Sequence, residues 1–308
     1  MILNINFLPY NRPHMMLQTV KELSKIELRY RDMFKVLFHS CHNINIKEHV
    51  DILNASDIQV EVVDYPDHAY MPKIHNAVSR NIKYSMKIDE DIFMNRYAFA
   101  YLIDTLDVLD NDKNLLLTPT LSTGIPSLEM FIDDVFTSSE KEDIYNIFNN
   151  VHMFGFLGAN YEVLNLGMDR WDPNSFYRAV KQKVHHHFKG IHPLRISYQA
   201  QKKMVDVIKT KKNKILDRQN YHIEPMPVTY ICNSVFAIRT DTWQKIISNQ
   251  SLYKDAFDEV PINSYKDIHD LNICFIRNAN ALHPGYNTIV ELHNLCDEQH
   301  AMLNEWGI

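Results

Sequence analysis

Apolar and polar residues alternate in two different rhythms over roughly the first 120 positions. Short apolar, β-prone runs predict strands, and they fall at 2–8, 34–39, 58–64, 84–89 and 114–119. The segments between them carry apolar residues at helical spacing, which predicts helices over 14–26, 46–54, 72–82 and 95–109. Strands that alternate with helices in this way are typical of a parallel sheet. We therefore expect an α/β fold with a mostly parallel central sheet flanked by helices.

The pattern is harder to interpret between 122 and 226, where glycine-containing loops and a basic stretch replace the regular alternation. Beyond it, 228–239 predicts another strand, and helices are predicted over 240–248 and about 265–278.

The domain organisation follows from this change of pattern. No internal repeat or low-complexity linker divides the chain. We expect a βα half at 1–121 and a second half at 122–308, with a helical and loop insertion at about 150–226, all in one integrated domain.

Composition and net charge limit the classes of protein to which this chain can belong. Hydrophobic residues make up 45% and charged residues 23% of the 308 residues, as in ordinary globular proteins. The net charge of −6 argues against nucleic acid as a partner. Four scattered cysteines without a C-x-x-C pair indicate reduced thiols. Since neither a signal peptide nor a membrane span is recognisable, we expect a cytoplasmic protein with at most peripheral membrane contact.

Glycine is scarce, and its distribution excludes two common phosphate-binding motifs. The chain has 7 glycines, and none precedes Gly124. An N-terminal G-x-G-x-x-G turn and a Walker P-loop are excluded, because both need glycine to bring backbone N–H groups against phosphates. If the N-terminal half binds a nucleotide, a metal held by carboxylates is the natural substitute.

Three consecutive acids end the predicted strand in "KYSMKIDEDIFM" (83–94). In a strand Asp89 and Asp91 point to one side and Glu90 to the other. Two carboxylates on one side repel each other unless a cation lies between them, and Mg²⁺ or Mn²⁺ prefers such oxygen ligands. The alternative is a solvated turn in which Asp91 or Asn95 caps the next helix.

Several segments resemble, in the right order, the inverting family 2 of nucleotide-sugar glycosyltransferases, which have the GT-A fold. "YSMKIDEDIFM" is similar to the D-x-D region of that family, and the other segments are "INFLPYNRPHMMLQTVKEL" (5–23), "PKIHNAVSRNIKYSMKIDED" (72–91), "CNSVFAIRTDTWQKI" (232–246) and "KDIHDLNICFIR" (266–277). The family's aspartate after the second strand is replaced by "FHSCHN" (38–43), so the resemblance does not indicate the nucleobase.

The resemblance implies a metal and donor site at the strand ends. Asp91 is implied as the main metal ligand, and Asp89 as a ligand of the metal or the ribose. His283 is preferred over His293 for completing the metal shell. The implied nucleotide contacts, each of which has a structural alternative as a turn, cap or helix residue, are Pro9, Tyr10, Asn11, Arg12, Asp64, Lys73 near the diphosphate, and Asn76.

An inverting transfer needs a carboxylate that takes the proton from the acceptor hydroxyl. Asp270 is the first choice for this base, because Ile273 and Arg277 follow it at helical spacing as in the family. Asp267 is the second choice, and its alternative is a capping box with Ser264.

The basic stretch and its histidines leave two interpretations open. Between 170 and 218 there are 13 Lys and Arg against 3 Asp. This charge indicates either a solvated helical face or an anionic acceptor or surface. His185–His187 cannot all face one ion. Trp171, Tyr177 and Trp243 are candidates for stacking on sugars or for core packing.

Together these observations predict a glycosyltransferase that uses a nucleoside-diphosphate sugar, of UDP or GDP type, with Mn²⁺ or Mg²⁺. The expected acceptor is a hydroxyl of a glycan or lipid-linked molecule, and an anionic acceptor is the functional interpretation of the basic stretch. The alternatives are a catalytically silent binding protein of the same fold and a nucleotidyltransferase, although the latter usually opens with a glycine-rich phosphate loop.

Overall fold

The computed structural model describes residues 1–10, 12–122, 127–150, 198–228, 231, 233–248, 259–283 and 290–308. Asn11 and most of the predicted insertion, with Trp171, Tyr177 and His185–His187, lie outside the described residues. The strands in chain order are β1 (Leu3–Leu8), β2 (Phe34–Cys41), β3 (Val60–Tyr65), β4 (Tyr84–Asp89), β5 (Asn114–Leu121), β6 (His222–Met226), β7 (Val235–Arg239) and β8 (Asn272–Ala281).

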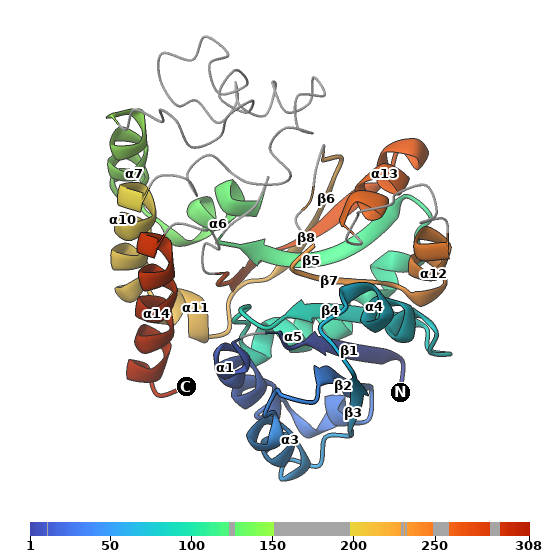
Figure 1. Ribbon diagram of the computed structural model, residues 1–308. Coiled ribbons are helices and arrows are strands. Elements are labelled where there is room, and N and C mark those ends of the chain that lie inside the picture. Colours follow the sequence, from blue (N-terminus) through green and yellow to red (C-terminus); the bar gives the residue numbers. More distant parts are fainter. Residues whose placement is uncertain are drawn as a thin grey trace.

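The helices are distributed along the whole described chain (Figure 1). In chain order they are α1 (Pro13–Ser24), α2 (Leu28–Arg31), α3 (Lys47–Asn54), α4 (Tyr70–Val78), α5 (Arg96–Asp104), the 3₁₀ helix η1 (Leu106–Asp110), α6 (Ser127–Val135), α7 (Ser138–Asn150), α10 (Tyr198–Lys209), α11 (Lys212–Leu216), α12 (Thr240–Ser248), α13 (Glu259–His269) and α14 (Val290–Glu305). Among the described residues, no helix is both long and apolar enough to cross a membrane.

One sheet of eight strands forms the centre of the structure, in the order β3-β2-β1-β4-β7-β5-β8-β6. The pairings make β1 to β5 and β8 parallel to one another, while β6 and β7 run in the opposite direction. The predicted α/β fold with a mostly parallel central sheet flanked by helices is confirmed. The sheet includes strands from both predicted halves, and the division at 121 stays a prediction.

Each face of the sheet has its own apolar core, because successive side chains of a strand point to opposite faces. Val235 and Ala237 of β7 belong to the cluster that packs under α1, α3 and α5. Phe236 and Ile238, one position along, pack with α4, α12 and α13. Trp243 of α12 is fully buried in this second cluster, so the core-packing alternative for this residue is confirmed.

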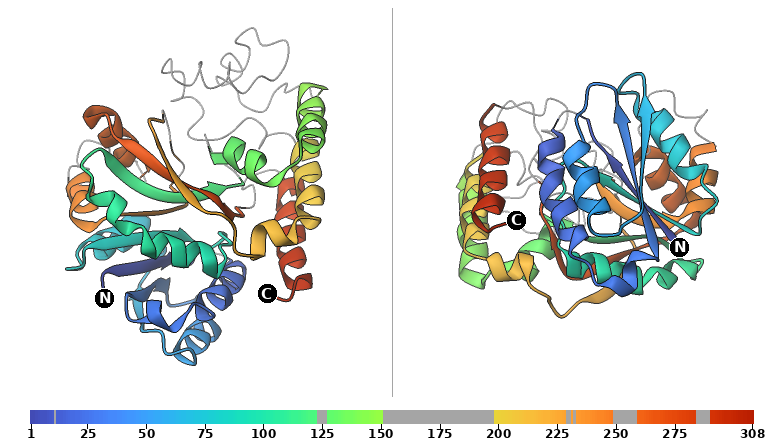
Figure 2. Two further views of the ribbon diagram at one scale, coloured as in Figure 1. Left: turned by 180° about the vertical axis from the view of Figure 1, so that it is seen from behind. Right: turned by 90° about the horizontal axis from the view of Figure 1, so that it is seen from below.

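A third apolar cluster joins the sheet to a layer of helices at its side. The helices α7, α10 and α14 stand next to one another in both views (Figures 1 and 2). Ion pairs link them, including Lys202 of α10 with Glu298 of α14. Much of the basic charge that the structure describes in this region therefore lies in ion pairs between helices, and the anionic acceptor stays a prediction.

The predicted helix at 265–278 is wrong. The helix α13 begins earlier, at Glu259, and ends at His269, after which 272–281 forms the strand β8. Asp270 has a left-handed backbone with φ of 51°, and the Leu271 N–H donates to the Lys266 carbonyl at 3.0 Å. This is the Schellman end of a helix, with Asp270 in the position that glycine usually takes. Ser264 lies within the helix, so the capping-box alternative is wrong too.

A chain of polar side chains crosses four neighbouring strands on the face of the sheet opposite to the first core. His39 of β2 is fully buried, and its Nε2 lies 2.9 Å from Asn6 Oδ1 of β1. Its Nδ1 lies 3.0 Å from the Tyr65 hydroxyl of β3, and the Asn6 amide donates to the Met86 carbonyl of β4 at 3.0 Å. Because Asn6 Oδ1 can only accept, the proton of the neutral imidazole lies on Nε2, and the Tyr65 hydroxyl donates to Nδ1. Burial lowers the pKa of His39 to about 3.

This burial predicts that the protein loses stability in mild acid. His39 stays neutral in the folded protein while it charges in the unfolded chain, so its contribution is complete above about pH 6.5 and falls as the pH drops toward 3. We expect up to about 1.4 kcal/mol of lost unfolding free energy per pH unit in this window. Urea denaturation at about pH 7 and about pH 5 measures it, and His39→Gln should flatten the dependence relative to wild type. His75→Gln, at an exposed position of α4, is the control and should not change the slope.

Candidate active site

The register of the sheet brings three chain segments to one place. Leu8 at the end of β1 pairs with Asp89 at the end of β4, so the turns that follow these parallel strands lie side by side. The strand β7 runs antiparallel to β4, and the Asp89 N–H donates to the Ser234 carbonyl just before β7 at 2.9 Å. Ligands in open α/β sheets bind beyond the carboxyl ends of the parallel strands, and this is such a position.

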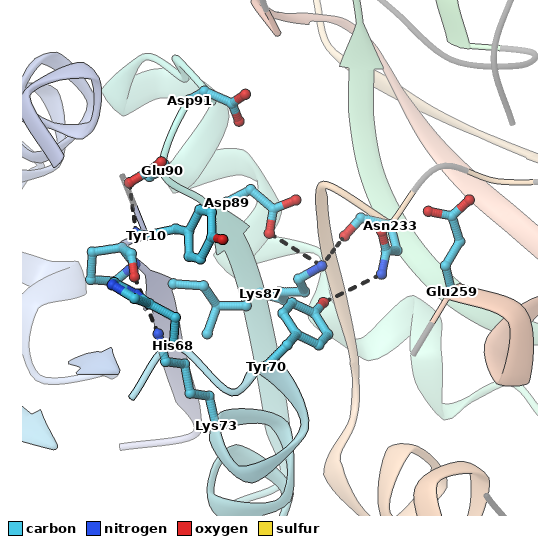
Figure 3. Close-up of a pocket in the computed structure, with 12 residues that line it drawn as sticks. Tyr10, His68, Tyr70, Lys73, Lys87, Asp89, Glu90, Asp91, Asn233 and Glu259 are labelled. Carbon is cyan, nitrogen blue, oxygen red and sulfur yellow. Dashed lines mark hydrogen bonds and ion pairs between the residues drawn. The ribbon is translucent and has the colours of Figure 1, made fainter. Parts of the chain in front are cut away.

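A cavity of about 570 Å³ opens at this position (Figure 3). This volume is in the range of pockets that hold small-molecule ligands. The described residues that line it come from the turns after β1 and β4, from the start of α4 with the segment before it, from the segment before β7, and from the start of α13: Leu8, Pro9, Tyr10, His68, Tyr70, Lys73, Lys87, Asp89, Glu90, Asp91, Asn233 and Glu259.

The three consecutive acids point in different directions and have different partners. The strand β4 ends at Asp89, and a turn follows. The carboxylates of Asp89 and Asp91 extend to the same side, and Glu90 extends to the opposite side, toward Tyr10 (Figure 3). Glu90 accepts the backbone N–H of Tyr10 at 2.7 Å and that of Arg12 at 2.9 Å. The third acidic side chain therefore fastens the turn after β1 to the turn after β4.

Asp89 has a cationic partner that lies two positions earlier on the same strand. The Lys87 ammonium lies 3.2 Å from Asp89 Oδ1 and donates to the Asn233 carbonyl at 2.8 Å. The Lys87 side chain is 1% exposed, while that of Asp89 is 29% exposed. Lys87 lies on the same face of β4 as Asp89, because side chains two positions apart in a strand point the same way.

Asp91 meets His283, which is 192 positions later in the chain. A pair of backbone hydrogen bonds joins Phe93 to Leu282, at 2.8 and 2.9 Å. This bridge places His283 Nε2 3.5 Å from Asp91 Oδ2, with both side chains less than a tenth exposed. Ser122 accepts from the backbone N–H of His283 at 2.8 Å and thereby holds its position. Two of the three predicted metal ligands are thus neighbours.

The Asp91–His283 pair is compatible with a divalent cation, although the described residues contain no group of three His, Cys, Asp or Glu that could hold one. Carboxylate oxygen and imidazole nitrogen are both common ligands of Mn²⁺, and ions of this kind often keep only one or two protein carboxylates beside phosphate oxygens and water. The separation of 3.5 Å suits two ligands on adjacent positions of one ion. The donor set therefore fits a cation that a substrate completes.

The charges around the cavity also favour a cation. Four carboxylates and two ammonium groups are among its described lining residues, a formal charge of −2 with His68 neutral. An entering diphosphate adds further negative charge, which the site tolerates only with added positive charge. Lys73 is one of the two ammonium groups already counted: its side chain is buried rather than solvated, and its ammonium donates to the Pro9 carbonyl at 3.3 Å. The alternative of a solvated first-turn lysine is wrong.

Aromatic side chains form the other wall of the cavity. Tyr10 is half exposed, and its ring meets the edge of the His68 ring with the centroids 4.9 Å apart. His68 is held from behind by the Cys41 thiol, whose sulfur lies 3.3 Å from Nδ1. Tyr70 lies over the Lys87 ammonium. An exposed tyrosine ring backed by an ordered imidazole can contact the flat face of a base or sugar.

Several predicted contact residues are not brought to the cavity. Asp64 is exposed within β3, and Asn76 of α4 accepts a hydrogen bond at 3.0 Å from Arg80, which follows the end of that helix. Arg12 precedes the first residue of α1 and is not among the lining residues. The Asn95 side chain accepts from the Ala98 N–H, so this residue caps α5 as the structural alternative had it. The predicted roles of Asp64, Asn76 and Arg12 stay predictions.

The two predicted catalytic bases lie at the far end of α13. Glu259, the first residue of this helix, lines the cavity. Asp267 is eight positions later, which is about 12 Å along a helix. It is exposed and paired with Lys266, and Asp270 is exposed beyond the helix end. Glu259 was missed because the helix was expected to begin near 265. Pro261 was the available signal, since proline favours the first turn of a helix.

Comparison with known proteins identifies no family. No protein-family model matches the sequence, and no curated protein matches it. Among solved structures, the chain is similar to the mannosyltransferase PcManGT from Pyrobaculum calidifontis in complex with GDP-Man and Mn²⁺, at 7% identity and a TM-score of 0.46. The alignment covers 94% of this chain and 58% of that one.

Two further likenesses are to TarS from S. aureus. The first has 11% identity and a TM-score of 0.36, and it covers 71% of this chain and 50% of TarS. The second is to residues 1–349 in complex with UDP-GlcNAc, at 10% identity and a TM-score of 0.34, covering 71% and 82%. This chain thus spans a little over half of PcManGT and half of the longer TarS chain. At these scores the likenesses carry no argument about function, which has to come from the site.

The position of Lys87 predicts a structural role that a double-mutant cycle can measure. Lys87→Met removes the donor to the Asn233 carbonyl and the ammonium beside Asp89, so we expect a loss of about 1–3 kcal/mol of unfolding free energy. Asp89→Asn should cost less, because Asp89 is partly exposed. Urea denaturation of both variants and of their combination gives the coupling energy. If the two effects simply add, the ion pair does not contribute to stability.

Proposed function

We propose that this protein is a glycosyltransferase that moves a sugar from a nucleoside-diphosphate sugar to a hydroxyl of a glycan or lipid-linked acceptor. The observation that carries the proposal is the convergence of Asp89, Asp91 and His283 beside a cavity at the carboxyl ends of β1 and β4. Buried acids, two lysines and an aromatic wall in one cavity suit a ligand that combines a diphosphate, a metal and flat rings.

The donor would lie between the aromatic wall and the acids. Tyr10 and His68 would contact the nucleoside, and Pro9 would line its path. Lys73 and Lys87 would neutralise part of the diphosphate charge from the floor of the cavity. Asp89, whose carboxylate is held by Lys87 at the edge, would accept hydrogen bonds from a ribose hydroxyl or contribute to the metal.

Asp91 and His283 would hold a divalent cation, Mn²⁺ or Mg²⁺, which when bound stabilises the negative charge of the leaving diphosphate. Their burial would exclude water from one side of the leaving phosphate and would keep their side chains in place before the donor enters. Because the cation would stabilise the leaving group, the protein needs no acid at that position. It needs only a base on the acceptor side.

Glu259 is the carboxylate that lies at the cavity in a position to serve as this base. It faces the cavity from the side opposite to the turn after β1 (Figure 3). A base there would take the proton of the acceptor hydroxyl as its oxygen attacks the anomeric carbon, which leads to inversion. Asp267 and Asp270 stay candidates from the sequence, although both lie outside the cavity lining.

A catalytically silent protein of the same fold is the second candidate. One observation favours it: the described residues include no cluster of three potential metal ligands. Such a protein would bind a nucleotide or glycan without turning a donor over, and the experiment below separates the two functions.

The proposed function predicts metal-dependent turnover that depends on Asp91. Wild-type protein and Asp91→Ala are assayed for hydrolysis and transfer with a panel of UDP-, GDP-, CMP- and dTDP-sugars in Mn²⁺, Mg²⁺ or EDTA. We expect one donor to be consumed with the metal, and we expect EDTA or Asp91→Ala to lower the rate by about a hundredfold or more. Asp51→Ala, at an exposed position of α3, is the matched control. Binding of a donor without turnover under every condition would favour the silent protein.

The assignment of the base predicts a difference between two carboxylates of the same segment. Glu259→Gln should lower kcat by about 10²–10⁴-fold while donor binding changes little, because only the proton acceptor is lost. Asp270→Asn should keep near wild-type activity. The opposite result would move the base to the far end of α13 and would contradict the placement of the acceptor. The anomeric configuration of the product, read by NMR, tests inversion directly.

A further inference from the structure

The turn between β1 and α1 already holds an anion, and that anion is part of the protein. Backbone N–H groups at the start of a helix following a strand are a common place for a ligand phosphate. Here the N–H groups of Tyr10 and Arg12 are directed at the Glu90 carboxylate, at 2.7 and 2.9 Å. Each oxygen accepts one of them, Oε2 from Tyr10 and Oε1 from Arg12.

The surroundings of Glu90 favour a permanent contact. Glu90 is 5% exposed, and Arg12 is the residue just before α1, a helix of 12 residues. The positive end of the α1 dipole therefore stabilises the carboxylate, and hydrogen bonds to an ionised group are stronger than those between neutral groups. The contact joins two turns 78 residues apart in the chain.

We propose that Glu90 is the positioning residue of the donor site, and that its carboxylate occupies the phosphate position of the β1–α1 turn. The inference rests on the proposed function for its ligand. Glu90 holds the backbone of Tyr10, whose ring lines the cavity next to His68, and it keeps the diphosphate away from the β1–α1 amides. The diphosphate would therefore bind in the part of the cavity next to Lys73, Lys87 and Asp91.

This assignment explains two features of the sequence together. The segment before α1 contains no glycine, and it needs none, because the group that approaches its amides is a side chain and not a phosphate. The middle acid of the three holds the turn, while its two neighbours extend to the opposite side and line the cavity (Figure 3).

The first experiment removes the charge and keeps the shape. Full-length wild type, Glu90→Gln and Glu22→Gln are titrated calorimetrically with UDP and with GDP in the presence of Mn²⁺. Glu22 is the matched control, since it is also buried, accepts from a backbone N–H, that of Arg96 at 3.4 Å, and does not line the cavity. We expect Glu90→Gln to raise the Kd of the bound nucleotide on the order of tenfold, and Glu22→Gln to leave it unchanged.

A second measurement excludes simple misfolding. In Glu90→Ala the vacated anion position is open to formate, so added formate should restore most of the nucleotide affinity, and the same concentration of chloride should not. Hydrogen exchange at the Tyr10 and Arg12 amides should be slow in wild type, fast in Glu90→Ala and slow again with formate.

The results of these experiments distinguish a failure of this inference from a failure of the proposed function. If wild type binds neither nucleotide, the proposed function fails and this inference fails with it. If wild type binds a nucleotide but Glu90→Gln binds it equally well, only the inference is overturned. If Glu90→Ala loses affinity and formate restores neither affinity nor amide protection, Glu90 does not act through the anion position and the inference is overturned as well.

Discussion

The clustering of three consecutive carboxylates at the end of β4, two of them buried and one partly exposed, is the constraint on which the site depends. Adjacent negative charges out of water are tolerated only when each has its own partner. The chain meets this condition with three different groups: an ammonium from the same strand for Asp89, backbone amides for Glu90 and an imidazole from after β8 for Asp91. The partners come from distant segments, so satisfying the charges also assembles the cavity.

The scarcity of glycine is related to the way in which the acidic turn satisfies backbone amides. A turn that binds phosphate through its amides needs close backbone approach, which favours glycine. When a side chain of the protein accepts from the amides of the turn, the turn does not need glycine. Positive charge at the cavity then comes from side chains such as Lys73. Glycine is also not used at two helix ends, where Asp57 and Asp270 have the left-handed backbone conformation instead. The left-handed backbone of such an Asp is explained by the helix end, independently of what its side chain does.

Local patterns predicted the elements of the first half, and long-range pairing decided the rest. The run 84–89 is a strand with the predicted bounds, because alternation and apolar character agree there. The position of Glu259 depends on where α13 begins, and Pro261 was the local signal for a start earlier than 265. By contrast, nothing local to His283 indicates Asp91 as its neighbour. That contact follows from the bridge between Phe93 and Leu282, which joins positions 189 apart in the chain.

The buried lysine in β4 makes the two outer acids unequal. Asp89 forms an ion pair with Lys87 and is partly open to the cavity, whereas Asp91 is buried beside the His283 imidazole. A cation that enters the cavity gains more from Asp91, because the charge there is less compensated by an ammonium and less screened by water. The two acids of the Asp-x-Asp thus look equivalent in the sequence, but their surroundings in the structure differ. Asp89 is suited to hydrogen bonds with a ligand, and Asp91 is suited to the cation.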